Sequence, residues 1–220
     1  MFIATAAVDT SMPGLFGQVN DFARSTGWLH APVLAYATYG VVLFAGLLLA
    51  GWWIARDRGS RVMAAALWSG IGTLVAVAAN QPVVSGVHEA RPYTVHPHIL
   101  VLAHHSADYS FPSDHAVMAG AVTAGLWLVS RRLGAIAAVA AVLMAASRVY
   151  IAAHYPHDVL AGLALGAVVV LIGWLVLSRP LTWLVGLLGR TPLRPLLVRG
   201  SRDAVHGPAD VTASSRQVPA

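Results

Sequence analysis

The sequence contains no cysteine and no lysine among its 220 residues, and it has little charge of either sign. Without cysteine, the chain has no disulfide framework and no thiolate for catalysis or metal ligation. Charged residues make up 10% of the chain, against about 25% in an average soluble protein, whereas hydrophobic residues make up 57%. Because a soluble globule could not cover so much apolar surface, we expect an integral membrane protein.

Long apolar runs are abundant, and they predict the fold. A membrane-spanning helix needs about 20 apolar residues. The sequence holds five runs near that length, at 33–55, 62–80, 114–130, 134–151 and 158–178. The third and fourth are short and would cross only with tilt, local thinning of the bilayer, or polar ends that face water. We therefore predict an all-α, polytopic helical membrane bundle with about five spanning helices, in a membrane domain of residues 33–180.

The segments outside these runs predict other structures. Within residues 1–32, apolar residues recur three to four positions apart from Leu15 to Ala23, which indicates a short amphipathic helix on the membrane surface; a loose polar leader is the alternative. Residues 93–111 contain four histidines and predict an outer loop with one interfacial helix. Residues 190–220 lack an apolar pattern and predict a disordered tail.

All 14 basic residues are arginine, and their positions predict the orientation. If five helices alternate in direction, eleven arginines fall on one side of the membrane and three, Arg24, Arg91 and Arg148, on the other. The positive-inside rule assigns the side with eleven to the cytoplasm, so the C-terminus is expected there. A net charge of +5 raises the question of a nucleic-acid partner. The arginines lie between apolar runs, which fits membrane topology better, and we expect no nucleic acid.

The scarce ionisable residues gather in three clusters on the predicted outer side. The cluster at 147–158, S-R-V-Y-I-A-A-H-Y-P-H-D, places His154 four residues before Asp158. Pro156 suits the first turn of a helix, where Asp158 would be stabilised and would reach one ring nitrogen of His154. The other nitrogen would then serve as a nucleophile or base. Arg148 presents a fork of donors suited to phosphate, although pairing with a carboxylate or a headgroup is the alternative.

The second cluster is F-P-S-D-H at residues 111–115. Ser113 is a good helix N-cap after a proline, and the free N–H groups of the first helical turn form an anion site. His115 would lie beside a bound anion, where it could act as a general acid. An ordinary capped helix with an interfacial histidine is the alternative.

The third cluster is H-E-A-R-P at residues 88–92. Arg91 precedes a proline, so its backbone is held extended. It is a second candidate fork for phosphate, and pairing with Glu89 is the alternative. Taken together, the three clusters supply what phosphoryl transfer through a phosphohistidine requires. Arginines and amides neutralise the phosphoryl oxygens, one histidine attacks, and the other protonates the leaving oxygen.

The three motifs resemble those of the type 2 phosphatidic acid phosphatase superfamily, which includes the vanadate haloperoxidases. The pattern S-R-x5-H-x3-D is matched by Ser147, Arg148, His154 and Asp158, R-P by Arg91 and Pro92, and P-S-x-H by Pro112, Ser113 and His115. The resemblance spans residues 15–178. It implies His154 as the nucleophile, Asp158 as its orienting partner and His115 as the general acid. It also implies a phosphate site without metal or cofactor, formed by Arg91, Arg148, Ser113 and the adjoining Asp114.

Two positions depart from the family pattern. Val84 stands where the family has a lysine, for which His88 is the available substitute, and Asp114 stands where the family usually has glycine. P-S-D-H and the leader L-F-x2-V-N-D-F-A-x-S-T are similar to the bacitracin-resistance branch of undecaprenyl pyrophosphate phosphatases. This favours a polyprenyl pyrophosphate over phosphatidic acid or phosphatidylglycerophosphate as the substrate.

The resemblance implies a phosphatase in a bacterial plasma membrane, with its active site on the extracytoplasmic face and with a lipid phosphate and the bilayer as its partners. The rivals within the enzyme class are a phosphatidic acid or phosphatidylglycerophosphate phosphatase, a lipid phosphotransferase and a haloperoxidase. The rival of another class is a non-catalytic lipid-binding membrane protein. The remaining histidines lack the i,i+4 spacing and acidic neighbours of a metal site, and we expect an interfacial role for them. They are His96, His98, His104 and His105.

Overall fold

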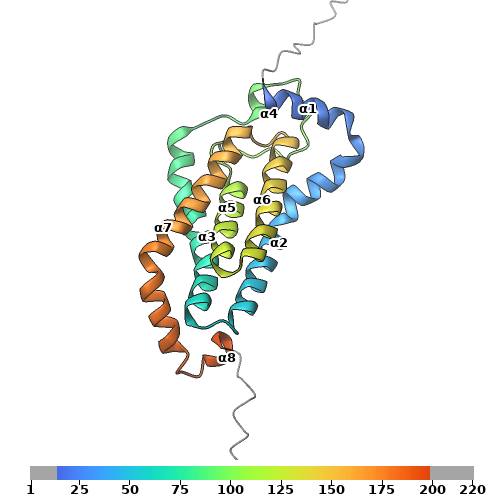
Figure 1. The fold of residues 1–220 in the computed structure, drawn as a ribbon. Coiled ribbons are helices and arrows are strands. Elements are labelled where there is room, and N and C mark those ends of the chain that lie inside the picture. The colour runs from blue at the N-terminus through green and yellow to red at the C-terminus, as the bar shows by residue number, and fades with distance from the viewer. Residues whose placement is uncertain (1–13, 199–220) are drawn as a thin grey trace, which may run out of the picture.

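The structure, a computed structural model, describes residues 14–198, which form a bundle of helices with a helical cap at one end (Figure 1). The long helices are α2 (His30–Ala55), α3 (Ser60–Val87), α5 (Asp114–Val129), α6 (Arg131–Tyr150) and α7 (Pro156–Leu188). The short ones are α1 (Leu15–Ser25), η1 (Gly27–Leu29), α4 (Pro92–Val95) and α8 (Arg194–Leu197). The described range contains no strand, so the all-α prediction is confirmed. Residues 1–13 and 199–220, which belong to the predicted leader and tail, lie outside it.

Four of the long helices, α2, α3, α6 and α7, are long and apolar enough to cross a membrane. The fifth, α5, is apolar but shorter, with 16 residues. It lies in the middle of the bundle and packs against α3, α6 and α7 (Figure 1). The prediction of about five membrane helices is confirmed, with α5 as the short central one.

Glycines at the crossing of α5 and α7 let the two backbones approach closely. A Cβ atom added to Gly166 would lie 2.0 Å from the carbonyl oxygen of Val117, and one added to Gly120 would lie 2.2 Å from that of Leu163. Contact this close is typical of helices that associate in membranes. It fixes the start of α5 against the start of α7, where two of the three motifs lie.

Two helices continue beyond the predicted spans, which were 62–80 and 158–178. Helix α3 runs to Val87 and α7 runs to Leu188, each with a proline inside the helix. The predicted ends marked where apolar character stops. A helix satisfies its own backbone hydrogen bonds, however, and so it can continue past polar residues such as Gln81 and Arg179.

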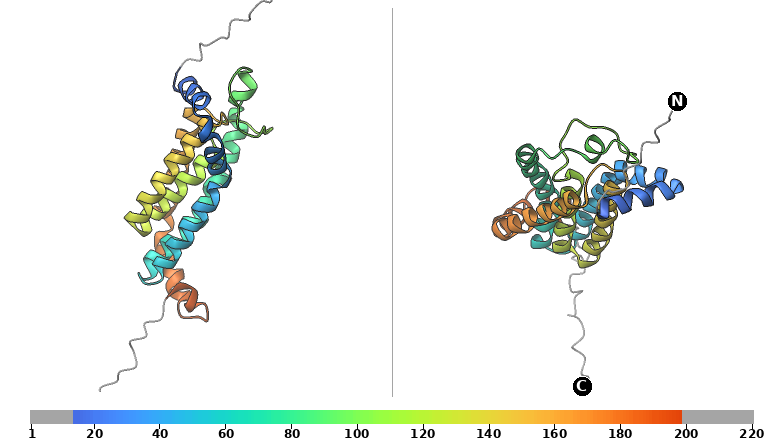
Figure 2. Two further views of the ribbon diagram at one scale, coloured as in Figure 1. Left: turned by 90° about the vertical axis from the view of Figure 1, so that its right-hand side faces the viewer. Right: turned by 90° about the horizontal axis from the view of Figure 1, so that it is seen from above.

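Helix α1 lies at the same end of the bundle as the connection between α3 and α5 (Figures 1 and 2). The side-chain amide of Asn20 donates to the carbonyl of Leu100 at 2.8 Å, and its oxygen accepts from the N–H of Leu100 at 3.1 Å. Phe16 packs on the rings of His96 and Tyr155. The predicted amphipathic helix is therefore present, and its buried face holds the outer loop in place.

The outer loop and the start of the tail are both tied to helices. Within the loop, α4 is a single short helix, and the carbonyl of Ile151 accepts from the N–H groups of Leu102 and Ala103. At the other end of the bundle, the indole of Trp52 donates to the carbonyl of Leu196 at 3.1 Å. The described part of the predicted disordered tail is thus a turn and a short helix against α2, because Trp52 bonds its backbone.

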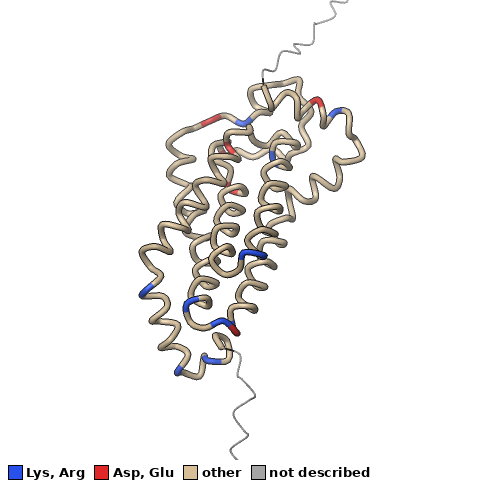
Figure 3. The backbone as a smooth tube through the Cα atoms, in the orientation of Figure 1, with Lys and Arg blue, Asp and Glu red and all other residues tan. Residues whose placement is uncertain are grey.

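Basic residues gather at the end of the bundle where α2 ends and α6 begins, opposite the three motifs (Figure 3). The described arginines toward that end are Arg56, Arg58, Arg61, Arg131, Arg132, Arg179, Arg190 and Arg194. The separation of charge predicted from the sequence is therefore present along the bundle axis.

Candidate active site

A tight turn between α6 and α7 brings Arg148 and His154 together. The chain reverses at Ala152, whose φ of 60° is in the left-handed region. The N–H of Ala153 donates to the carbonyl of Arg148 at 3.1 Å, which closes the turn. Arg148 and His154 are six residues apart in the sequence, and in the structure Nη2 of Arg148 lies 3.5 Å from Nε2 of His154.

The ring of His154 is buried and held in one orientation. Its Nδ1 atom lies 2.8 Å from the carbonyl oxygen of Ser110. A carbonyl only accepts hydrogen bonds, so we assign the ring proton to Nδ1 and the lone pair to Nε2. The Nε2 atom lies 3.3 Å from Nη1 of Arg91 as well as 3.5 Å from Nη2 of Arg148. The ring nitrogen that carries the lone pair therefore faces two guanidinium groups.

Asp158 lies behind the His154 ring and is fully buried. Its Oδ2 atom is 3.5 Å from Nδ1 of His154 and accepts hydrogen bonds from the N–H of Tyr155, at 2.8 Å, and from the hydroxyl of Ser110. The sequence predicted a direct contact between Asp158 and the ring. The structure places the carbonyl of Ser110 closer, with Asp158 as the charged group just beyond it.

The surroundings of His154 keep its ring neutral. Burial lowers the pKa of His154, and the charges of Arg148 and Arg91 act in the same direction. The hydrogen bond and charge of Asp158 act in the opposite direction on this pKa but do not outweigh burial. A neutral ring near pH 7 has the free lone pair that a nucleophile needs.

The two guanidinium groups are fixed by backbone carbonyls. Nε of Arg91 donates to Asp108 at 2.8 Å and its Nη1 to Ala153 at 3.1 Å, while Nη1 of Arg148 lies 3.4 Å from the carbonyl of Ala37. Nε of Arg148 is buried and has no hydrogen-bond partner among the described residues. Within residues 14–198, neither guanidinium is paired with a carboxylate. Two adjacent positive charges with unused donors form a site for an anion such as phosphate.

Ser113 is the N-cap residue of α5, as predicted, but its hydroxyl does not cap the helix. The hydroxyl is buried without a partner, and the backbone N–H of Ser113 donates to the carbonyl of Asp158 at 3.2 Å. The sequence had suggested that the backbone amide of Ser113 could bind an anion. In the structure this amide is already used by Asp158 and is not free. The first helical bond runs from Val117 to Ser113, which leaves the N–H groups of residues 114–116 for an anion.

The carboxylate of Asp114 is turned toward α3. Its Oδ1 atom accepts hydrogen bonds from Nδ2 of Asn80 at 2.7 Å and from Nε2 of Gln81 at 3.0 Å. Asp114 was predicted as a phosphate-binding residue. In this arrangement its backbone N–H is the group that can face a phosphate, because a carboxylate repels one. His115 follows in the same helical turn, within electrostatic reach of Arg148 and His154.

The position of the family lysine is occupied by Val84, on α3 one turn beyond Asn80. The proposed substitute, His88, ends α3 and packs its ring against Tyr109 at 4.5 Å. His105 packs in the same way against Tyr93. These contacts place both histidines in the aromatic packing of the outer loop.

One group of side chains in the described range has imidazole and carboxylate atoms close enough for a cation, namely Glu89, His157 and Asp158. Nε2 of His157 lies 2.8 Å from Oε1 of Glu89 and 3.0 Å from Oδ1 of Asp158. The first distance is that of a hydrogen bond, and the second is that of an ionic contact. The sequence suggested Glu89 only as a partner of Arg91 and assigned no role to His157.

Three further residues at the site were not found from the sequence. Ser110 stands just before the F-P-S-D-H motif, and this closeness was the one available signal. Asn80 and Gln81 end an apolar run in another helix, and nothing in their sequence context pointed to Asp114. Their role depends on the packing of α3 against α5.

Comparisons with known proteins agree with these motifs. The family model described as the PAP2 superfamily matches residues 65–181. An undecaprenyl-diphosphatase, BcrC of Bacillus subtilis, is 28% identical over 73% of this chain and 80% of its own length. The bacitracin transport permease protein BcrC of Bacillus licheniformis is 29% identical over 69% of this chain and 73% of its own length.

A third relative is a decaprenylphosphoryl-5-phosphoribose phosphatase of Mycobacterium tuberculosis, 39% identical over 47% of this chain and 56% of its own length. No solved structure matches the chain. The family match covers more than half of the sequence, including all three motifs and the helices that carry them. The chain therefore belongs to the PAP2 superfamily, as the motifs predicted.

Proposed function

We propose that this membrane protein is a phosphatase that hydrolyses a polyprenyl diphosphate, such as undecaprenyl diphosphate, to the monophosphate through a phosphohistidine. The observation that carries the proposal is the orientation of His154. Its Nδ1 is bound by Ser110 beside Asp158, and its Nε2 faces Arg91 and Arg148. The related undecaprenyl-diphosphatase of Bacillus subtilis supports this choice of substrate.

The terminal phosphate binds between the two arginines and the start of α5. The guanidinium groups and the N–H groups of residues 114–116 donate to its oxygens, and the unpaired hydroxyl of Ser113 gains a partner. Positive charge and aligned N–H groups neutralise the phosphoryl oxygens as the transition state forms. This arrangement does not use a lysine at position 84, since the two arginines and the helix N-terminus provide the donors.

The chemical step then proceeds on His154. Its Nε2 lone pair attacks phosphorus in line, and the bond from phosphorus to the bridging oxygen breaks. His115 gives a proton to the departing lipid phosphate. Asp158 and the carbonyl of Ser110 stabilise the positive ring while Nε2 carries the phosphoryl group. Water, which His115 deprotonates, attacks phosphorus and releases inorganic phosphate, so that Nε2 regains its lone pair.

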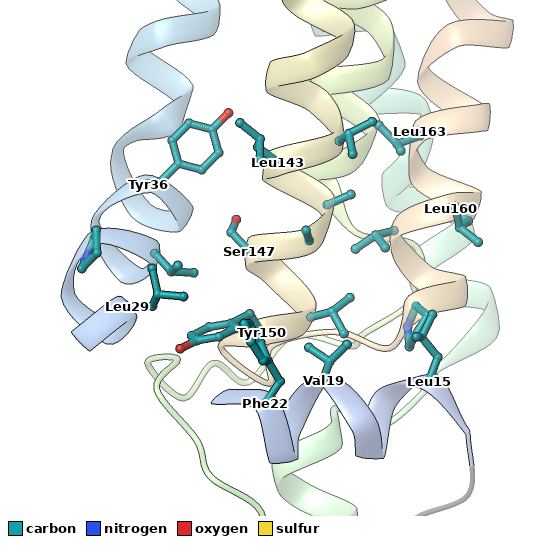
Figure 4. A pocket seen from close by; sticks show the side chains of 18 residues that line it. Leu15, Val19, Phe22, Leu29, Tyr36, Leu143, Ser147, Tyr150, Leu160 and Leu163 are labelled. Carbon is teal, nitrogen blue, oxygen red and sulfur yellow. The ribbon is translucent and has the colours of Figure 1, made fainter. Parts of the chain in front are cut away.

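An apolar groove beside these motifs supports a lipid substrate. It lies between α1, α2, α6 and α7 and has a volume of about 730 Å³ (Figure 4). Ser147 and Val149, on either side of Arg148, line it, and so do Pro156, two residues before Asp158, and Val159, directly after it. A prenyl chain in this groove would therefore contact the same helices that carry the phosphate site. We place the site on the extracytoplasmic face, because the opposite end carries most of the arginines.

Phosphate release by the detergent-solubilised chain tests the proposal. The panel contains undecaprenyl diphosphate, phosphatidic acid and phosphatidylglycerophosphate, and each lipid is also given to a His154→Ala variant. The expected result is fastest turnover of the diphosphate and no turnover by the variant. Equal turnover by His154→Ala would overturn the role of His154, and no release from any lipid would favour a non-catalytic lipid-binding protein.

A second candidate substrate is a phosphorylated sugar carried by a polyprenyl lipid. The relative from Mycobacterium tuberculosis, whose matched region is 39% identical, supports it. Decaprenylphosphoryl-5-phosphoribose therefore belongs in the same panel. Turnover of this lipid ahead of the diphosphate would select the second candidate without changing the role of His154.

A further inference from the structure

His157, at the start of α7, lies between two carboxylates. Its Nε2 atom is 2.8 Å from Oε1 of Glu89 and 3.0 Å from Oδ1 of Asp158. The side chain of Asp158 is fully buried, whereas that of Glu89 is 28% exposed and that of His157 is 59% exposed. His157 therefore connects the buried carboxylate behind the nucleophile with the edge of the site.

The two oxygens of Asp158 serve different histidines. Oδ2 faces the nucleophile, at 3.5 Å from Nδ1 of His154, and accepts from Tyr155 and Ser110. Among residues 14–198, Oδ1 has no hydrogen-bond partner, and Nε2 of His157 lies 3.0 Å from it. A buried carboxylate oxygen without a partner costs free energy, so the ring of His157 stabilises the orientation that Asp158 needs.

Glu89 belongs to the segment that carries Arg91. Its backbone carbonyl accepts from the N–H of Ser110 at 2.8 Å, and its side chain binds His157. The contacts form a closed path from Glu89 through His157 and Asp158 to His154, whose Nε2 lies 3.3 Å from Arg91. Glu89, where the path begins, and Arg91, where it returns, are two residues apart in the sequence.

Ring packing fixes the plane of the His157 imidazole. The ring stacks on Tyr155 with centroids 5.4 Å apart and planes 8° apart, and it lies 6.0 Å from the ring of Phe111. The charged groups in contact with His157 are the carboxylates of Glu89 and Asp158. The sequence spacing did not reveal this arrangement, because Glu89 and His157 are 68 residues apart.

We propose that His157 and Glu89 are positioning residues for phosphoryl transfer, acting through Asp158. His157 holds Asp158 so that Oδ2 remains behind the ring of His154, and Glu89 holds His157 and the Arg91 segment to the same framework. The proton on Nε2 of His157 stays there throughout the reaction. The proposal rests on the proposed phosphatase function, and it predicts that this pair affects the chemical step more than the binding of phosphate.

Two substitutions at position 157 separate the hydrogen bonds from the ring packing. His157→Phe keeps an aromatic ring against Tyr155 and Phe111 but removes the nitrogen. His157→Gln places an amide nitrogen with two hydrogens between the two carboxylates. We expect kcat to fall about 5- to 30-fold in His157→Phe with KM nearly unchanged, which is the effect of one lost hydrogen bond to a charged group. The glutamine variant should stay within about threefold of the wild type, since it restores both contacts.

A substitution of Glu89 tests the path itself. Glu89→Ala should also lower kcat. The double variant Glu89→Ala with His157→Phe should be no slower than His157→Phe alone, because both changes break the same path. Additive losses would overturn the proposal. So would wild-type kcat in His157→Phe, a change confined to KM, or equal losses of kcat and thermal stability in His157→Phe and His157→Gln.

Orthovanadate binding gives a readout that needs no lipid substrate. Vanadate adopts the five-coordinate geometry of the transition state, whereas inorganic phosphate resembles the bound product. By titration calorimetry of the solubilised chain, His157→Phe should weaken vanadate binding about 5- to 30-fold and leave phosphate binding nearly unchanged. Equal affinities of the wild type and the variant for vanadate would overturn the role of His157. If the wild-type chain binds vanadate but releases no phosphate from any lipid in the panel, that result would instead count against the proposed substrate.

Discussion

Nε2 of His154 lies 3.3 Å from Nη1 of Arg91, on the side of the ring that faces away from Ser110. Arg91 thus stands where a phosphate would meet the nucleophile, and its charge lowers the pKa of His154. The same guanidinium group therefore has two measurable effects, one on phosphate affinity and one on the protonation of the ring.

The first prediction concerns pH. Burial is the largest cause of the lowered pKa of His154, so the ring stays neutral below its ordinary value of 6.5 and kcat/KM should fall only at lower pH. Arg91→Gln removes a charge that lowers this pKa. The pKa should rise, and the acidic limb of the kcat/KM profile should move to higher pH.

The same variant should lower the maximum kcat/KM roughly 10- to 150-fold, because a charge-assisted contact to phosphate is lost. The control is Arg24→Gln, since Arg24 lies in α1 and binds the carbonyl of His98. In Arg24→Gln, the acidic limb of the kcat/KM profile should stay at its wild-type pH. A limb that does not move in Arg91→Gln would contradict the electrostatic coupling.

The second prediction concerns Ser110, whose hydroxyl donates to Oδ2 of Asp158. Ser110→Ala removes this donor but keeps the backbone carbonyl that binds His154. We expect kcat to fall about 5- to 30-fold, because a buried carboxylate loses a hydrogen bond. Steady-state phosphate release measures the effect, with Ser25→Ala, at an exposed position of α1, as the control. Wild-type kcat in Ser110→Ala would show that the orientation of Asp158 does not depend on this hydroxyl.

The third prediction concerns Asp114, whose carboxylate binds Asn80 and Gln81 close to the anion site. Asp114→Asn keeps an oxygen that accepts from both amides and removes a negative charge. The KM for a lipid diphosphate should fall about fivefold at low ionic strength, which corresponds to roughly 1 kcal/mol of relieved repulsion. Asp21→Asn removes the same charge at an exposed position of α1 and should leave KM unchanged. An increase in KM for Asp114→Asn would mean that the carboxylate helps to bind the substrate.

The fourth prediction concerns the apolar groove of Figure 4. Ala146 lines it on α6, and Ala146→Trp would fill part of its volume. KM for undecaprenyl diphosphate should rise about tenfold, because buried prenyl surface is lost. KM for a soluble diphosphate with a five-carbon chain should not change. Ala135→Trp, at an exposed position on the same helix outside the groove, is the matched control, and equal effects of the two tryptophans would argue against a lipid chain in the groove.

The sequence alone determined the class of fold and the set of candidate reactive residues. Apolar runs near the length of a bilayer, with few charges, permit only helices that satisfy their own backbone, and this predicted the bundle. The spacings S-R-x5-H-x3-D, R-P and P-S-x-H identified His154, Arg148, Arg91 and the start of α5, because these distances along the chain follow from one turn or one helix start. The position of the arginines predicted which end of the bundle would carry the site.

Tertiary packing decided how those residues are held. Ser110 binds His154 and Asp158, Asn80 binds Asp114, and Glu89 reaches His157 across 68 residues of sequence. Each of these contacts joins elements that are distant in sequence, so no local period or spacing encodes it. The close approach of α5 to α7, which glycines such as Gly166 permit, brings the start of α5 beside Asp158. The sequence therefore determined which groups are candidates for the reaction, and the packing of the helices decided which groups orient them.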